Sequence, residues 1–313
     1  MSKTAFIFSG QGSQYVGMGR DLYLNIPVSR YIFNMADELL NFSLSKTIFE
    51  GPAEELNMTP ITQPAILTVS IAALKALEEH NIKPDLVAGF SLGEYSALIC
   101  SGALKFEDAL PLVNKRGKYM QGAVPEGLGS MAAIIGLNKE KVIEICKKAS
   151  QIGIVEGANF NCPHQIVIGG EIQALKYASE LAIIEGAIKV VPLNVSAPFH
   201  TSMLSPAAER LEAELRNIKI YPIKIPVISN VTADYMDESN IKELLKMQVK
   251  SPVLWEAIIR KMISEGIDTF VEIGPGKVLS GFLKRIDRGV KALNIEDLRT
   301  LQNTVKALEG GYE

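Results

Sequence analysis

Short runs of apolar residues that end at Gly, Ser or Asn mark the expected strands of a central sheet. They lie at residues 5–8, 86–88, 227–229 and 269–273. Apolar runs of this length are typical of parallel strands that are covered on both faces. Segments with helical periodicity separate them, at 29–40, 65–77 and 92–100. The pattern therefore predicts an α/β core built on a parallel sheet.

The segment between residues 129 and 195 follows a different order of elements. Its apolar runs lie at 131–135, 152–155, 165–168 and 188–195, and its helical patterns at 139–148 and 172–184. This order, βαββαβ, is that of a ferredoxin-like unit, in which two helices cover one face of a sheet. We therefore expect a core of residues 1–125 and 196–313 and an inserted ferredoxin-like subdomain of residues 126–195.

Composition and charge exclude several classes of protein. The 313 residues are 47% hydrophobic and 21% charged, as in ordinary folded proteins, and a net charge of −3 provides no general attraction to nucleic acid or to an anionic membrane. No apolar stretch is long enough to predict a membrane span, and the apolar run near the N-terminus is too short for a signal peptide. The three cysteines are widely spaced, which favours reduced thiols over disulfides or a metal site. A cytoplasmic location is the default expectation.

The strongest chemical motif is Gly89-Phe90-Ser91-Leu92-Gly93, a G-x-S-x-G sequence between an expected strand and an expected helix. In an α/β-hydrolase-like core this context produces a strained turn that exposes the serine oxygen at the edge of the sheet. The backbone N–H of Leu92 would then face an oxyanion. An ordinary Gly-Ser turn is the alternative interpretation.

A nucleophilic serine needs a base, and the chain has only three histidines. His80 lies at the polar end of an expected helix, and His164 lies inside the inserted unit. His200 follows the apolar run where the chain returns to the core, so it is the best candidate, although a lone histidine is more often structural.

Two further polar segments have an open interpretation. Ser9-Gly10-Gln11-Gly12 follows the first strand and could complete an oxyanion hole, but it lacks the third glycine of a dinucleotide-binding motif. Arg116 follows a helical pattern at 106–113, and from the sequence pattern alone it is best interpreted as solvated charge.

Taken together, Gly10-Gln11-Gly12-Ser13-Gln14, Gly89-x-Ser91-Leu92-Gly93-Glu94-Tyr95, Asn159-x-Asn161 and Phe199-His200 resemble the malonyl-CoA:acyl carrier protein transacylase family. These motifs recur in the family's order over residues 4–290. The same fold serves as the acyltransferase domain of polyketide and fatty acid synthases.

The resemblance implies a role for each matching residue. Ser91 is the nucleophile that carries the acyl group and His200 is the general base, oriented by the main-chain carbonyl of Gln248. The oxyanion-hole amides fall on Gln11 and Leu92. Arg116 falls on the family arginine that binds the free carboxylate of malonate. The residues that match the pocket lining are Phe199, Gln63 and Met120.

The resemblance also implies a ping-pong transfer from malonyl-CoA to the thiol of an acyl carrier protein, without a metal or redox cofactor, in a monomer that serves fatty acid synthesis. A discrete acyltransferase of a polyketide synthase is an alternative, as are a serine thioesterase or esterase and a carrier-binding scaffold with a decayed site.

Phe90 and Ser9 depart from the family's usual histidine and proline, so acyl selectivity is open at Phe90. The acidic carrier favours a locally basic docking surface, for which Lys189 is a candidate, although exposed lysines are common.

Overall fold

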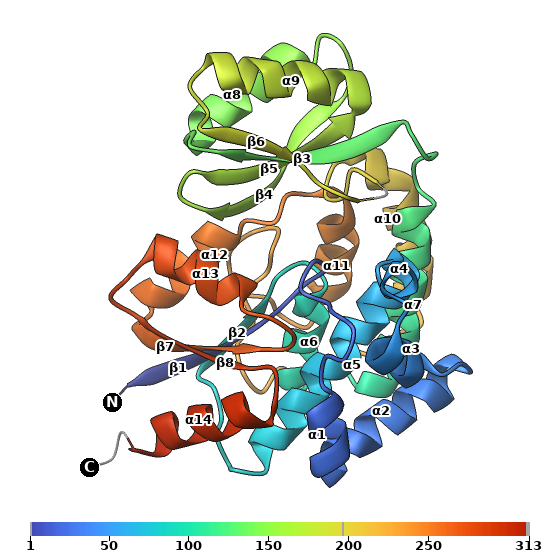
Figure 1. Ribbon diagram of the computed structural model, residues 1–313, viewed down its shortest axis with the longest axis vertical. Helices are drawn as coiled ribbons and strands as arrows, with labels where there is room; N and C mark the ends of the chain where they lie inside the picture. The colour runs from blue at the N-terminus through green and yellow to red at the C-terminus, as the bar shows by residue number, and fades with distance from the viewer. Residues whose placement is uncertain (1, 196, 311–313) are drawn as a thin grey trace.

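Two separate sheets organise the chain (Figure 1). The computed structural model describes residues 2–195 and 197–310, so position 196, where the second core segment was expected to begin, lies outside the described residues. One sheet has four parallel strands, and the other has four antiparallel strands. The expected fold class, a parallel α/β core with a separate inserted sheet, is confirmed.

The parallel sheet has the strand order β2-β1-β7-β8. Its strands are β1 (Lys3–Phe8), β2 (Leu86–Gly89), β7 (Ile267–Ile273) and β8 (Lys291–Ile295). Side chains alternate between the two faces of a strand, and in β1 Phe6 and Phe8 enter one hydrophobic cluster while Ala5 and Ile7 enter another. Both faces are therefore covered, which explains the continuous apolar runs in the sequence.

The prediction of a strand at 227–229 is wrong. This segment makes only an isolated parallel bridge between Val227 and Val87 and an antiparallel bridge between Ile228 and Tyr235. After Ser229 the chain turns. The Asn230 side chain then forms hydrogen bonds with the Ser91 N–H and the Gly89 carbonyl at the end of β2, and the segment does not continue as a strand of the sheet. The sequence patterns also missed β8, a half-buried edge strand whose first four residues are exposed or only partly buried.

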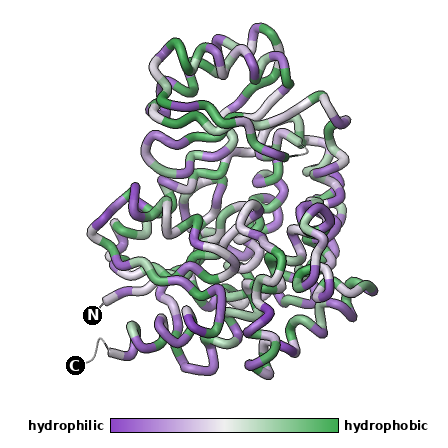
Figure 2. Tube along the Cα trace, in the orientation of Figure 1, coloured by the Kyte–Doolittle hydropathy of each residue, from purple (hydrophilic) through white to green (hydrophobic). Residues whose placement is uncertain are grey.

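Helices pack on both faces of the parallel sheet. The core helices before β2 are α1 (Arg20–Asn25), α2 (Pro27–Leu40), α3 (Leu44–Glu50), α4 (Ala53–Leu56) and α5 (Thr59–Glu78), and after β2 come α6 (Gly93–Cys100) and α7 (Phe106–Gln121). The later helices are η1 (Ser202–Leu204), α10 (Ser205–Leu215), α11 (Ile241–Lys250), α12 (Trp255–Ser264), α13 (Val278–Ile286) and α14 (Leu298–Glu309). Hydrophilic and hydrophobic positions are mixed along the helices at the surface (Figure 2), as expected for amphipathic helices.

Helix α5 differs from these amphipathic helices because it is apolar all round. It meets the length and composition requirements of a membrane span, but 83% of its most apolar window is buried inside the protein. Its position in the centre of the core explains this composition.

The antiparallel sheet has the strand order β4-β5-β3-β6 that a ferredoxin-like unit requires. Its elements are β3 (Gly129–Ile135), α8 (Lys139–Ala149), β4 (Val155–Cys162), β5 (Gln165–Glu171), α9 (Ile172–Ile184) and β6 (Lys189–Pro192). Helices α8 and α9 cover one face of this sheet, at the top of Figure 1.

Two expected strands of this unit were misplaced. The strand expected at 152–155 begins only at Val155, because Ile152 and Ile154 lie exposed in the turn after α8. The last strand ends at Pro192 and not at 195. We keep the boundaries 126 and 195 for the inserted subdomain as a proposal.

Candidate active site

Ser91 stands at a sharp turn between β2 and α6. Its φ of 51° lies in the left-handed region, which a serine rarely adopts. Asn230 holds the turn from outside: its Oδ1 accepts a hydrogen bond from the Ser91 N–H at 2.6 Å, and its Nδ2 donates to the Gly89 carbonyl at 2.6 Å. The surrounding structure thus fixes a strained backbone and exposes the serine oxygen.

The flanking glycines of the motif are required by close backbone contacts. A Cβ at Gly89 would lie 1.9 Å from the carbonyl of Gly93, and a Cβ at Gly93 would lie 2.2 Å from the Phe8 carbonyl. Only glycine permits this approach of strand, turn and helix.

His200 and Gln248 complete a hydrogen-bonded chain with the serine. The Ser91 Oγ lies 2.7 Å from His200 Nε2, and His200 Nδ1 lies 2.7 Å from the Gln248 carbonyl oxygen. A carbonyl can only accept, so Nδ1 carries the proton and Nε2 is free to accept from the serine hydroxyl. Gln248 lies in the last turn of α11, where backbone carbonyls have no partner within the helix.

Arg116 is 1% exposed and lies within α7, which continues to Gln121. The interpretation of Arg116 as solvated charge is therefore wrong: Arg116 lies on the buried face of α7, with Val113, Gly117 and Met120. Its Nη1 donates to Gln63 Oε1 at 2.7 Å and its Nη2 to Gln248 Oε1 at 2.9 Å, with Ser91 Oγ 3.4 Å from Nη2. A buried guanidinium thus lies beside the serine oxygen.

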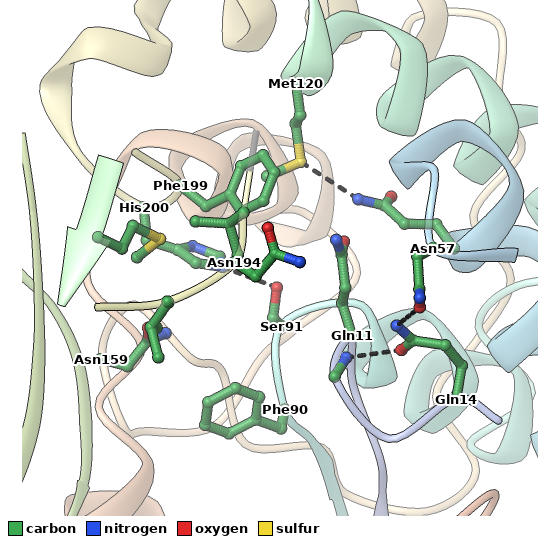
Figure 3. A pocket seen from close by; sticks show the side chains of 15 residues that line it. Gln11, Gln14, Asn57, Phe90, Ser91, Met120, Asn159, Asn194, Phe199 and His200 are labelled. Atoms are coloured by element: carbon green, nitrogen blue, oxygen red, sulfur yellow. Dashed lines mark hydrogen bonds between the residues drawn. The ribbon is translucent and has the colours of Figure 1, made fainter. Parts of the chain in front are cut away.

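A cavity of about 410 Å³ opens at Ser91. Figure 3 shows the serine hydroxyl directed toward His200, with Met120 and Phe199 on one side of the cavity and Phe90 on the other. The remaining lining residues are Gln11, Gly12, Gln14, Asn57, Gln63, Met131, Asn159, Leu193, Asn194 and Val195. The cavity therefore lies between the core and the inserted sheet.

Two backbone N–H groups are free to act as donors near the serine. Within residues 2–195 and 197–310, neither the Gln11 N–H nor the Leu92 N–H donates to a protein acceptor. Leu92 precedes the first turn of α6, where N–H groups have no partner within the helix. The two segments are adjacent, since a Cβ at Gly10 would lie 2.3 Å from the Phe90 carbonyl.

Comparisons with known proteins identify the family. The acyl transferase domain model matches residues 5–306. A malonyl CoA-acyl carrier protein transacylase of Bacillus subtilis (strain 168) is 50% identical over 311 residues, with 99% of this chain and 98% of the relative covered. The chain belongs to the malonyl CoA-acyl carrier protein transacylase family.

Solved structures of this family have the same fold. The transacylase of Clostridium perfringens ATCC 13124 matches with a TM-score of 0.96 at 50% identity, covering 99% of this chain and 98% of that one. A structure of a type II PKS acyl-carrier protein in complex with its malonyl-transacylase also matches, with a TM-score of 0.95 at 40% identity. The match covers 99% of this chain and 100% of the matched chain.

The other histidines of this transacylase family member lie away from the cavity. His80 follows the end of α5 and is exposed, while His164 lies in the turn between β4 and β5. Neither lines the cavity at Ser91. In the described part of the chain, no group of three or more His, Cys, Asp or Glu residues is arranged to hold a metal ion.

Two polar residues of the site were not singled out from the sequence. Asn230 holds the nucleophile turn, and Glu94 accepts hydrogen bonds from the Asn230 N–H at 2.7 Å and from the Gln248 side chain. The position of Glu94 inside the Ser91 motif was a signal that could have found it. Asn230 carried no such signal, because many turn residues follow an apolar run as it does. Asn159 and Asn194, which also line the cavity, carried no role in the sequence analysis.

Burial controls the protonation of the site. It lowers the pKa of His200 to about 4, and the Arg116 charge acts in the same direction. Burial raises the pKa of Glu94 to about 8, against hydrogen bonds from Asn230 and Gln248 and the charge of Arg116. His200 is therefore neutral near pH 7, with its Nε2 lone pair available to the serine.

Proposed function

We propose that this protein moves a malonyl group from coenzyme A to the phosphopantetheine thiol of an acyl carrier protein through a malonyl ester on Ser91. The observation that carries the proposal is the Ser91 hydroxyl, held 2.7 Å from His200 Nε2 and 3.4 Å from the buried Arg116 guanidinium. A nucleophile paired with a base supports acyl transfer, and a cation beside it supports an acyl group that carries a second carboxylate.

In the first half-reaction, His200 Nε2 takes the Ser91 proton while Oγ attacks the thioester carbonyl of malonyl-CoA. The Gln11 and Leu92 N–H groups stabilise the negative oxygen of the tetrahedral intermediate. When the carbon–sulfur bond breaks, the imidazolium returns its proton to the leaving coenzyme A sulfur. The carbonyl of Gln248 stabilises the imidazolium in the interval.

In the second half-reaction, the same groups act in reverse. His200 takes the proton of the phosphopantetheine thiol, the sulfur attacks the malonyl ester, and Ser91 Oγ leaves with the proton. Atoms and charge balance without a metal or redox cofactor, and coenzyme A thioester enters only as a substrate.

Arg116 selects the acyl group in this proposal. Its planar guanidinium suits bidentate contact with the malonyl carboxylate, which would replace or join the present contacts with Gln63 and Gln248. Phe199, Gln63 and Met120 shape the wall around the acyl chain, and the bulk of Phe199 disfavours a branched acyl group.

The partners and setting are part of the same proposal. We propose a monomer in the cytoplasm that serves fatty acid synthesis, with a polyketide pathway as the alternative. Lys189, exposed at the start of β6, is a candidate contact for the acidic carrier.

Intact-mass measurement after brief incubation with malonyl-CoA tests the proposal. The native chain should gain one malonyl group, Ser91→Ala should gain none, and a phosphopantetheinylated carrier should remove the adduct and acquire it. Loss of the adduct to water at the same rate without carrier would instead favour a hydrolase. Absence of any adduct from any acyl-CoA would favour a scaffold.

A further inference from the structure

Glu94 is a buried carboxyl group that the proposed reaction does not use. It lies in the first turn of α6, is 0% exposed, and does not line the cavity. Its Oε1 accepts from the Asn230 N–H at 2.7 Å, and its Oε2 accepts from Gln248 Nε2. A buried carboxyl group whose hydrogen bonds go to Asn230 and Gln248, and not to Ser91 Oγ or His200, needs another explanation than chemistry on the acyl group.

Both partners of Glu94 contact the reacting groups. Asn230 holds the backbone on either side of Phe90 through its side chain. Gln248 contacts three of them: its carbonyl accepts from His200, its Nε2 donates to the Ser91 carbonyl at 2.8 Å, and its Oε1 accepts from Arg116. The orientation of the Gln248 amide therefore matters to the whole site.

Only one orientation of that amide satisfies its neighbours. A guanidinium can only donate, so the oxygen of Gln248 must face Arg116 and the NH₂ must face the opposite way. On that opposite side lie a Glu94 carboxyl oxygen and the Ser91 carbonyl, which both accept. A flipped amide would place NH₂ against the guanidinium and its oxygen against these two acceptors. Glu94 is thus an acceptor that opposes this flip.

We infer that Glu94 is a positioning residue for recognition of the acyl carboxylate, because it fixes the Gln248 amide and, through that amide, the Arg116 guanidinium. The inference rests on the proposed function. It assigns to Glu94 an effect on the preference for malonyl over acetyl groups, beyond any effect on folding.

The isosteric variant Glu94→Gln tests this role. A glutamine cannot accept at both ends, so its NH₂ must face either the Asn230 N–H or the Gln248 NH₂. The ratio of the malonyl to the acetyl acylation rates of Ser91 should fall by about tenfold, the size of one lost hydrogen bond between Gln248 and the Arg116 guanidinium. Because it is a ratio of two rates of the same sample, it is insensitive to the fraction of folded protein.

Glu272→Gln is a matched control. Glu272 in β7 is also 0% exposed, and its two oxygens accept from the N–H groups of Leu279 at 3.0 Å and Ser280 at 2.7 Å. These hydrogen bonds do not involve Ser91, His200, Arg116 or Gln248, so the control should lose thermal stability and keep the malonyl-to-acetyl ratio. A similar drop in the ratio for Glu272→Gln would overturn the inference.

Two further variants separate positioning from other effects. In an Arg116→Ala background, Glu94→Gln should leave the ratio unchanged, because Glu94 acts through Arg116; a further tenfold drop would overturn the inference.

If Glu94→Gln does not fold, Gln248→Met keeps the carbonyl that orients His200 and removes the amide, so it should lower the malonyl-to-acetyl ratio as well. A native malonyl-to-acetyl ratio in Gln248→Met would contradict the inference that Glu94 acts on Arg116 through the Gln248 amide. Failure of the native chain to form a malonyl adduct would instead refute the proposed function itself.

Discussion

The parallel-sheet core and the inserted antiparallel sheet meet at one cavity but contribute different things to it. The core supplies Ser91, His200, Arg116 and Gln248, all at most 8% exposed and joined by hydrogen bonds. The inserted sheet and the segment after it supply wall residues, namely Met131, Asn159, Leu193, Asn194 and Val195. The reacting groups therefore come from the core, and the inserted sheet with the segment after it shapes part of the space that an acyl group enters.

The ionisable residues of the two regions differ in their burial. In the core, the ionisable residues Arg116 and Glu94 are buried, and each forms hydrogen bonds with at least two other residues. In the inserted subdomain, Lys141, Lys148, Glu144 and Glu185 form ion pairs at the surface, between side chains that are 28–50% exposed. Buried charge can control chemistry because water does not screen it, whereas exposed pairs contribute little.

The largest expected effect is at His200. Replacing His200 by Ala should slow acylation of Ser91 by about 10²–10⁴-fold, since the serine loses its base. Rapid-quench mass measurement of the malonyl enzyme checks this. Asn159 is a wall residue from the inserted sheet. If replacing it by Ala slowed acylation equally, the conclusion that the core alone supplies the reacting groups would be wrong.

The next effect is expected at Arg116. Arg116→Ala should slow malonyl acylation by about 10²–10³-fold, the size expected for the loss of one partner of a buried charge pair, and acetyl acylation by less than about tenfold. Parallel rate measurements with malonyl-CoA and acetyl-CoA check this. Equal losses for both acyl groups would contradict a carboxylate-binding role.

A smaller effect concerns the pH dependence. A general base must be unprotonated, so activity falls as pH decreases through the pKa of His200, which burial holds at about 4. The acid limb of kcat/KM should therefore lie well below the ordinary histidine value of about 6.5. Because the Arg116 charge also lowers this pKa, the limb should move to higher pH in Arg116→Ala. An acid limb near 6.5 in the native chain would show that His200 is not held neutral by burial.

The smallest effect is expected in the inserted subdomain. Glu185→Gln removes the partner of Lys141 at 2.8 Å, and the free energy of unfolding should stay close to the native value because water screens this exposed pair. Denaturant unfolding measures this change. The acylation rate should stay at the native value, and a loss above about tenfold would mean that the subdomain takes part in the chemistry.

Much of the fold was predictable because local patterns agree with tertiary structure. The apolar runs at β1, β2 and β7 are covered on both faces, and βαββαβ gave the inserted sheet. The failures have separate causes. The run at 227–229 is as apolar as a strand, but its next residue, Asn230, is needed at the nucleophile turn. Edge strand β8 is half buried, so its pattern was weak.

The sequence by itself determined the nucleophile turn and narrowed the choice of base. The Ser91 motif depends on short-range backbone geometry, in which Gly89 and Gly93 allow strand and helix to approach, and a chain with three histidines offers few partners. Only the tertiary structure decided the environment of Arg116, Glu94 and Gln248. Their burial and hydrogen bonds arise where α6, α7 and α11 meet, and sequence spacing carries no information about such distant contacts.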